Sequence, residues 1–99
     1  MLTTTPIHPA KPLTAESLEG DLIQPGHAFF GMIWINRERL SGAPCFAGTR
    51  VPIKNLFDYI ESGYTLNQFL EDFDGVTQTQ AKGVLEAAQS GLLAELPKL

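Results

Sequence analysis

Hydrophobic residues in the second half of the chain recur with the spacing of α-helices. Three groups lie at i, i+3, i+4 and i+7 or close to it, which places the members of each group on one face of a helix. They are Ile53, Leu56, Phe57 and Ile60; Leu66, Phe69, Leu70 and Phe73; and Ala81, Val84, Leu85, Ala88 and Leu92. The pattern predicts three consecutive amphipathic helices.

Two matching capping motifs mark the starts of the second and third predicted helices. Thr65 is followed three residues later by Gln68, and Thr77 by Gln80. In a capping box the Thr hydroxyl accepts a backbone N–H of the first helical turn, and the Gln side chain bonds back to the cap. Residues 74–76 between the two helices read Asp-Gly-Val, where the glycine is free to take positive φ. The two helices are therefore expected to cross as a helix-turn-helix.

The segment before the helices is typical of a short β-ribbon. Residues 28–35 are rich in aromatic and β-branched types, and a second strand is expected at residues 45–46 or 50–51. A two-stranded ribbon is marginal in water by itself, so it gains by packing on the helices or on a second copy. For the aromatic residues of this strand, a place in the core or in a dimer interface is favoured over stacking on nucleic-acid bases. We predict a homodimer interface at Phe29, Phe30, Ile33, Trp34 and Ile35.

The first 27 residues show neither the periodicity of a helix nor that of a strand. They contain four of the seven prolines. We predict an extended N-terminal arm over residues 1–27, and one domain with the ribbon and the helix-turn-helix over residues 28–99. Leu18, Leu22 and Ile23 are the candidates for docking the arm onto that domain. The predicted fold class is mainly α, a three-helix unit preceded by a short β-ribbon.

Composition and charge narrow the class of protein. The 99 residues are 43% hydrophobic and 18% charged, as in a globular domain. The net charge of −4 argues against a general polyanion binder. A single cysteine excludes an internal disulfide and fits a reducing cytoplasm. The longest apolar run has eight residues, against the roughly 20 that a membrane span needs, so we expect a cytoplasmic protein without membrane association.

The reactive side chains form no pattern typical of an enzyme. His8 and His27 lie in the predicted arm, and no Cys/His spacing resembles a metal site. Cys45 has no sign of an activating base and is expected to be a small buried hydrophobe. The glycines are scattered, without the spacing of a phosphate-binding loop. We expect no enzymatic activity, no metal and no cofactor.

Residues 42–52 have the sequence GAPCFAGTRVP, which resembles the hallmark motif of the domain-of-unknown-function family 433. We call these residues the hallmark stretch. The family pattern is G-x-P-x-x-x-G-T-R-[IV]-P before a helix-turn-helix. The matching positions are Gly42, Pro44, Gly48, Thr49, Arg50, Val51 and Pro52. The resemblance covers about residues 33–96. It implies a homeodomain-like or winged-helix-like unit, and a role as the antitoxin of a toxin–antitoxin pair with a PIN-like nuclease toxin.

The third predicted helix carries the candidates for DNA contact. In a helix-turn-helix, the N-terminal residues of the second paired helix reach base edges in the major groove. Here these residues are Thr77, Gln78, Thr79, Gln80 and Lys82. Gln bonds adenine in two places, Thr touches the thymine methyl, and Lys reaches guanine or a phosphate. In the alternative, Thr77 and Gln80 only cap the helix and the other three form a solvated face.

Arg50 is a further candidate, at the junction of the ribbon and the first helix. Pro52 is tolerated at the first turn and fixes the start of that helix. The planar guanidinium of Arg50 suits a carboxylate or a phosphate. A structural bond to a backbone carbonyl, Asp58 or Glu61 is favoured over contact with DNA phosphate or toxin.

Two functional hypotheses stay open. The first is a dimeric DNA-binding transcriptional regulator and antitoxin, with operator DNA and a toxin as partners. The second is a protein–protein interaction module that binds no DNA. Residues 33–96 carry five basic and eight acidic side chains, so a monomer would bind DNA weakly. Glu71 also occupies the position four residues before the turn glycine, where closely crossing helices usually have a small residue, which favours the second hypothesis.

Overall fold

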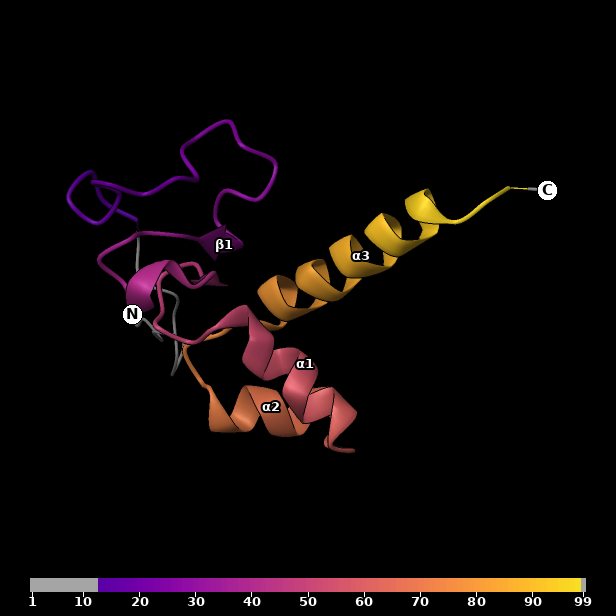
Figure 1. The fold of residues 1–99 in the computed structure, drawn as a ribbon. Helices are drawn as coiled ribbons and strands as arrows, with labels where there is room; N and C mark the ends of the chain where they lie inside the picture. The colour runs from indigo at the N-terminus through magenta and orange to yellow at the C-terminus, as the bar shows by residue number, and fades with distance from the viewer. Residues whose placement is uncertain (1–12, 99) are drawn as a thin grey trace, which may run out of the picture.

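The structure, a computed structural model, describes residues 13–98 of the chain (Figure 1). It is mainly helical, with a two-stranded antiparallel ribbon before three helices, which confirms the predicted fold class. The elements are β1 (Ile33–Trp34), the 3₁₀ helix η1 (Leu40–Gly42), β2 (Cys45–Phe46), α1 (Ile53–Glu61), α2 (Leu66–Asp72) and α3 (Gln78–Glu95). None of the helices within this range is long and apolar enough to cross a membrane.

The ribbon is shorter than the apolar run suggests. Ile33 pairs with Phe46 and Trp34 with Cys45, so the second strand forms at the first of its two expected places. Residues 28–32 form turns instead of extending the first strand: the N–H groups of Phe30 and Met32 donate to the carbonyls three residues earlier, those of His27 and Phe29. Aromatic and β-branched content alone therefore overestimates the length of this strand.

The helices begin where the sequence predicts. The Thr65 hydroxyl accepts the Gln68 N–H at 3.1 Å, and Gln68 Oε1 accepts the Thr65 N–H at 2.7 Å. Thr77 and Gln80 form the same pair of bonds at 3.0 and 3.1 Å. Both capping boxes are thus present, and the extended Pro52 is the N-cap residue of α1.

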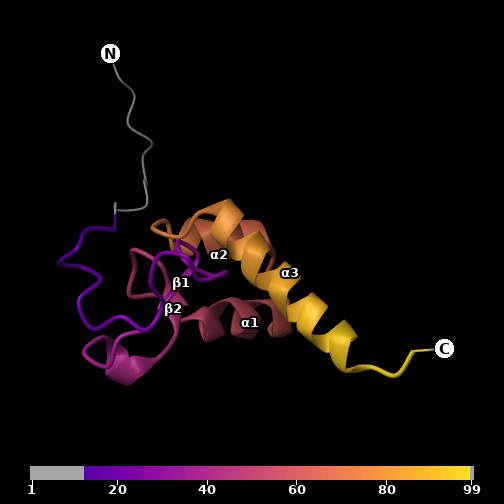
Figure 2. The same ribbon diagram turned by 90° about the horizontal axis from the view of Figure 1, so that it is seen from above.

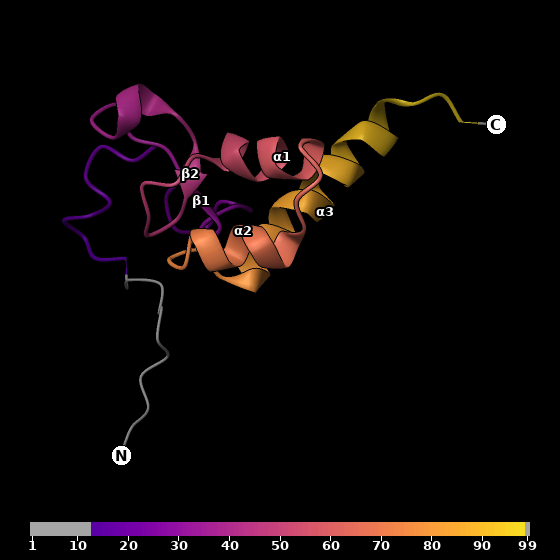
Figure 3. The ribbon, with the colours of Figure 1, turned by 90° about the horizontal axis from the view of Figure 1, so that it is seen from below.

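The hydrophobic core lies where the ribbon meets the three helices. α1 packs beside α2, and α3 crosses α2 as a separate helix after a turn at residues 73–77 (Figure 3). The buried cluster draws on every part of this arrangement: Phe46, Leu56, Phe69, Val76, Ala81 and Val84. α3 contributes only its first turns, and its C-terminal half projects beyond the other elements (Figure 2).

The described part of the N-terminal segment, residues 13–27, is bonded to the connection between β1 and η1, residues 35–39. The buried Asp21 forms an ion pair with Arg39 at 3.0 Å, and the side-chain amide of Asn36 donates to the Glu19 carbonyl at 2.7 Å. The Arg39 guanidinium also lies 3.5 Å from the centre of the Trp34 ring. The sequence predicts none of these polar contacts, which connect the N-terminal segment to the chain that follows β1.

Of the three apolar residues considered for docking, Ile23 is buried, Leu18 is half-buried and Leu22 is exposed. The exposed Leu22 lies between the buried Asp21 and Ile23, next to the isolated bridge between Asp21 and Asn36. Residues 1–12 of the predicted arm lie outside the described residues.

Replacing Asp21 with Ala is expected to lower the free energy of unfolding by about 3 kcal/mol, because the Arg39 guanidinium is left largely buried without a counter-charge. Chemical denaturation followed by circular dichroism measures the change. Asp58→Ala is the matched control: it removes the exposed Lys54–Asp58 pair and should leave stability nearly unchanged. Equal effects of the two substitutions would contradict the structural role of the buried pair.

Candidate functional site

Gln80 faces into the protein. Its Nε2 donates to the carbonyl oxygens of Gly31 at 3.1 Å and Ala47 at 3.0 Å, while Oε1 accepts the Thr77 N–H. Both amide protons are therefore used within the subunit. Gln80 therefore has the capping role, and its side chain does not extend toward a DNA groove, which corrects the prediction of a base contact at this position.

The other candidates on α3 lie around this buried amide. Gln78, Thr79 and Lys82 are exposed, and the half-buried Thr77 uses its hydroxyl as the helix cap. Because Gln80 fixes the opposite side of the helix against the ribbon, the three exposed side chains point outward. The start of α3 therefore presents an amide, a hydroxyl and an ammonium group to the solvent.

The end of the hallmark stretch forms a tight loop, residues 46–51, held by Thr49. Its hydroxyl donates to the Phe46 carbonyl at 2.8 Å and accepts the Val51 N–H at 3.0 Å. Its carbonyl accepts the indole N–H of Trp34 at 2.7 Å. Gly48 has a φ of +83°, a conformation that favours glycine. The Gly-Thr pair of the hallmark thus has a structural explanation.

This loop lies next to the start of α3. A Cβ built on Gly75, in the turn before α3, would lie 3.5 Å from the Thr49 methyl. On the other side of the loop, the Ala47 carbonyl accepts its bond from Gln80. The fold therefore brings the loop that carries Arg50 beside the helix end that carries the other candidates.

Arg50 is exposed, and within residues 13–98 no hydrogen bond or ion pair holds its side chain. Asp58 instead accepts bonds from Lys54, at 2.8 and 3.0 Å. The favoured expectation of a structural bond to Asp58, Glu61 or a carbonyl is therefore wrong for this conformation. The guanidinium is available to an external carboxylate or phosphate.

The predicted dimer-interface residues differ in how much of their surface the subunit uses. Phe29 is 36% exposed, whereas Phe30, Ile33, Trp34 and Ile35 are half-buried. Trp34 is engaged by Thr49 and Arg39. Ile33 packs on the core and helps to line an apolar groove of about 470 Å³ with Ile53 and Phe57. Much of this set therefore packs within one subunit.

The turn before α3 is flanked by acidic side chains. Glu71 is exposed on α2, so it does not separate α2 from α3. Asp72 accepts a bond from the Tyr59 hydroxyl at 2.7 Å, which raises the pKa of Tyr59. Asp74 follows within the turn. Three carboxylates therefore lie at the end of α2 and in the turn that precedes α3 in the chain.

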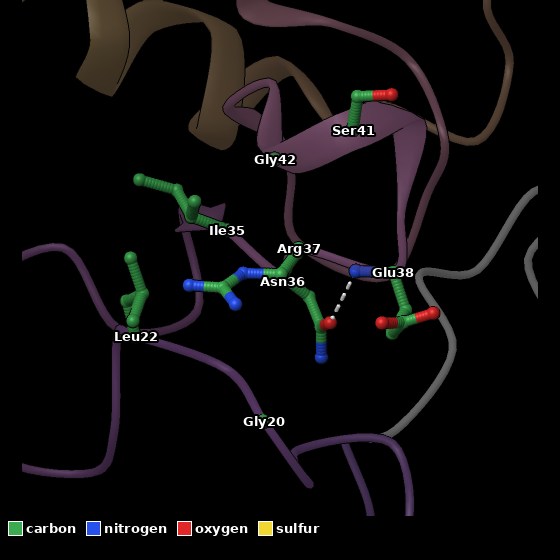
Figure 4. A pocket seen from close by; sticks show the side chains of 8 residues that line it. All are labelled: Gly20, Leu22, Ile35, Asn36, Arg37, Glu38, Ser41 and Gly42. Carbon is green, nitrogen blue, oxygen red and sulfur yellow. Dashed lines mark hydrogen bonds between the residues drawn. The ribbon is translucent and has the colours of Figure 1, made fainter.

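A hollow of about 440 Å³ lies between the N-terminal segment and η1 (Figure 4). Its polar floor is Asn36, whose Oδ1 accepts the Glu38 N–H at 2.8 Å, and Arg37 and Glu38 extend to opposite sides of it. Each polar group of the Asn36 side chain already has a partner. None of the candidates for DNA contact lines this hollow.

Cys45 is fully buried in β2, as expected, and its Sγ lies 3.4 Å from the Ala43 carbonyl oxygen. Burial raises the pKa of the Cys45 thiol, against the smaller opposing influence of Arg39 and Arg50. A nucleophilic role needs a lowered pKa and an accessible sulfur, and this environment supplies neither.

The family described as "protein of unknown function (DUF433)" matches residues 33–87, more than half of the chain. The protein belongs to this family, which confirms the resemblance seen in the hallmark stretch. The matched segment contains the ribbon, the hallmark, α1, α2 and the first half of α3. No curated protein and no solved structure matches the chain.

Gln80→Ala should lower the free energy of unfolding by about 1–3 kcal/mol, because the Gly31 and Ala47 carbonyls lose their donor. Gln78→Ala is the matched control, since the same side chain is removed from an exposed position two residues away. Its stability should stay within about 0.5 kcal/mol of the wild type. Thermal unfolding of both variants compares them directly, and an effect of Gln78→Ala as large as that of Gln80→Ala would exclude the special role of Gln80.

The native thiol of Cys45 should react slowly with a thiol reagent at pH 8. Its raised pKa reduces the thiolate fraction, and the buried sulfur is inaccessible to the reagent. The rate in denaturant should be at least tenfold higher, which a colorimetric disulfide assay measures. Equal rates in the native and denatured protein would show that Cys45 is not protected by the fold.

Proposed function

We propose that this member of the DUF433 family is a DNA-binding regulator in which the N-terminal end of α3 enters the major groove. The contrast between two glutamines carries the proposal: Gln80 holds the helix from inside, and Gln78 is exposed two residues before it. Recognition groups on a rigidly supported element keep the fixed directions that base contacts need.

The exposed groups match the chemistry of base edges and phosphates. Gln78 would donate to and accept from the N7 and N6 edge of an adenine, and the Thr79 methyl would contact a thymine. Lys82, one turn further along the helix, would reach guanine or the backbone. Arg50 would bind a phosphate from the adjoining loop, because its planar fork suits two phosphate oxygens.

Electrostatics makes this binding dependent on two copies. The start of α3 and the adjoining loop supply only Lys82 and Arg50 as cations, and each neutralised phosphate adds about 0.9 to the salt dependence of log K. A monomer would therefore have a shallow salt dependence and a low affinity. A two-fold dimer doubles these contacts on a symmetric operator.

The proposal extends to an antitoxin role in the cytoplasm, which the family resemblance implies. The net charge of −4 is physically suited to covering the basic groove of a PIN-like nuclease toxin, since it would imitate the charge of the nucleic acid. Co-expression with the product of the neighbouring open reading frame, followed by a pull-down, tests this part separately. Separate elution of the two proteins would count against it.

A second candidate function is a protein-interaction module that binds no DNA. Two observations favour it: the acidic residues Glu71, Asp72 and Asp74 beside the turn, and the exposed leucines at the end of α3. Acidic groups repel a phosphate backbone, and an apolar surface suits a protein partner.

Titration with DNA from upstream of the gene, at two salt concentrations, distinguishes the two functions. Gln78→Ala should weaken binding by roughly 5- to 150-fold and relax selectivity at one position, the range of one bidentate base contact. Lys82→Ala should reduce the slope of log K against log salt concentration by about 0.9 if the ammonium group contacts a phosphate. Fluorescence anisotropy of labelled DNA measures both effects.

Lys54→Ala and Asn67→Ala are the matched controls, because they remove an ammonium group and a side-chain amide from exposed positions on α1 and α2, outside α3. Both should bind like the wild type. If neither Gln78→Ala nor Lys82→Ala changed the affinity for DNA, or if no sequence-selective binding occurred at either salt concentration, the protein-interaction module would be supported instead.

A further inference from the structure

The hollow between the N-terminal segment and η1 combines an unpaired cation with an uncovered apolar side chain (Figure 4). Its volume of about 440 Å³ is within the range of small-molecule sites. The same volume of liquid water contains about 15 molecules. The hollow thus has the size of a site for a small organic ligand.

Hydrogen bonds hold one wall and the floor of the hollow in place. The Leu22 N–H donates to the Ile35 carbonyl at 2.9 Å, which fixes the wall formed by the N-terminal segment. On the floor, the Asn36 side chain donates to the Glu19 carbonyl at 2.7 Å and accepts the Glu38 N–H at 2.8 Å. The cavity is therefore formed before any ligand enters, which lowers the cost of binding.

The opposite wall has an unusual backbone conformation. Leu40, Ser41 and Gly42 of η1 have φ values of +49°, +57° and +88°. Positive φ is uncommon for residues that carry a side chain, and such conformations concentrate at binding sites. Ser41 and Gly42 both line the hollow. The strained backbone and the cavity thus occur at the same place, which is a second observation that points to a ligand.

Arg37 supplies the hollow with a charge that the subunit does not use. Its side chain is exposed and, among the described residues, forms no hydrogen bond or ion pair. The nearby Arg39, by contrast, is held by Asp21. The Arg37 guanidinium lies on the side of the hollow where Leu22 and Ile35 are found (Figure 4). A cation beside apolar side chains is complementary to a carboxylate that carries a hydrocarbon chain.

Leu22 supplies the apolar surface for such a chain. Its side chain is 73% exposed, whereas Ile35 beside it is half-buried. Packing a hydrocarbon chain on Leu22 removes apolar surface of both molecules from water, which favours binding. Leu22 also lies outside residues 33–87, the segment that matches the family. The N-terminal segment of this chain therefore completes the hollow.

Glu38 limits the charge of the ligand. Its carboxylate extends to the side opposite Arg37 (Figure 4), so a second negative group on the ligand would be repelled there. The same repulsion disfavours a phosphate monoester, which carries nearly two negative charges. A single carboxylate pairs with Arg37 without approaching Glu38.

We propose that the hollow binds a small aliphatic monocarboxylate. The carboxylate pairs with the Arg37 guanidinium, and the hydrocarbon chain packs on Leu22 and Ile35. The site is independent of the proposed DNA binding, because none of the candidates for DNA contact lines it.

Titration of the isotope-labelled protein with hexanoate, followed by two-dimensional NMR, tests the site. Hexanoate should shift the amide signals of residues 20–22 and 35–42 and saturate in the millimolar range or below, as expected for a ligand of this size. Hexanol, which has the same chain length and no charge, should bind at least tenfold more weakly because it forms no charge-assisted bond. No saturable shift, shifts centred elsewhere, or equal binding of the two compounds would overturn the proposal.

Arg37→Gln separates a specific ion pair from general attraction to positive charge. The variant should bind hexanoate at least tenfold more weakly and unfold at the wild-type temperature, because the side chain has no partner in the subunit. Lys54→Gln is the matched control, since it removes one positive charge from an exposed position that does not line the hollow. Equal losses of affinity in the two variants would overturn the proposal.

Two further variants test the chain and the charge of the ligand. Leu22→Ser should weaken hexanoate binding by about fourfold or more, the contribution of one buried methylene, whereas Leu92→Ser removes an exposed leucine from α3 and should have no effect. Adipate, the dicarboxylate of the same length, should bind more weakly than hexanoate, and Glu38→Gln should reduce this difference. Equal effects of the two leucine variants, or wild-type binding of adipate as tight as that of hexanoate, would show that the assigned ligand class is wrong.

Discussion

The side-chain amide of Gln80 is the interaction on which the arrangement of this protein depends. It completes the cap of α3 and at the same time holds that helix against two carbonyls of the ribbon region, those of Gly31 and Ala47. An unpaired buried carbonyl costs free energy, so alternative positions of the helix start are disfavoured. The direction in which Gln78 and Lys82 face the solvent therefore depends on a residue that has no exposed function of its own.

A continuous set of polar contacts supports this position from the N-terminal side. Asp21 holds Arg39, Arg39 lies over Trp34, and the Trp34 indole bonds to Thr49. The Thr49 methyl in turn lies against the turn before α3. These contacts of Thr49 give the Gly-Thr part of the hallmark a structural role. Arg50, the next residue, is the part of the hallmark that stays exposed. The family hallmark thus combines a structural loop with one exposed cation.

α3 consists of two halves in different surroundings. Its first half contributes Ala81 and Val84 to the core and carries the proposed DNA contacts, and the family match ends at residue 87. Its second half is bare and lies beyond that match. With few cations near the start of the helix, a second copy is a physical requirement of the proposed DNA binding.

The sequence by itself determined the helices, because the 3.6-residue period, the two Thr/Gln capping boxes and the proline before α1 are local features. It also gave residues 45–46 as one of two possible places for the second strand, and it indicated the loop in the family hallmark. Only the tertiary structure decided which polar side chains turn inward, since the bonds of Gln80 join residues 33 and 49 positions apart. The same holds for the buried Asp21–Arg39 pair. Likewise, periodicity placed Ala88 and Leu92 on the apolar face, but the extent of the core decided that they stay uncovered.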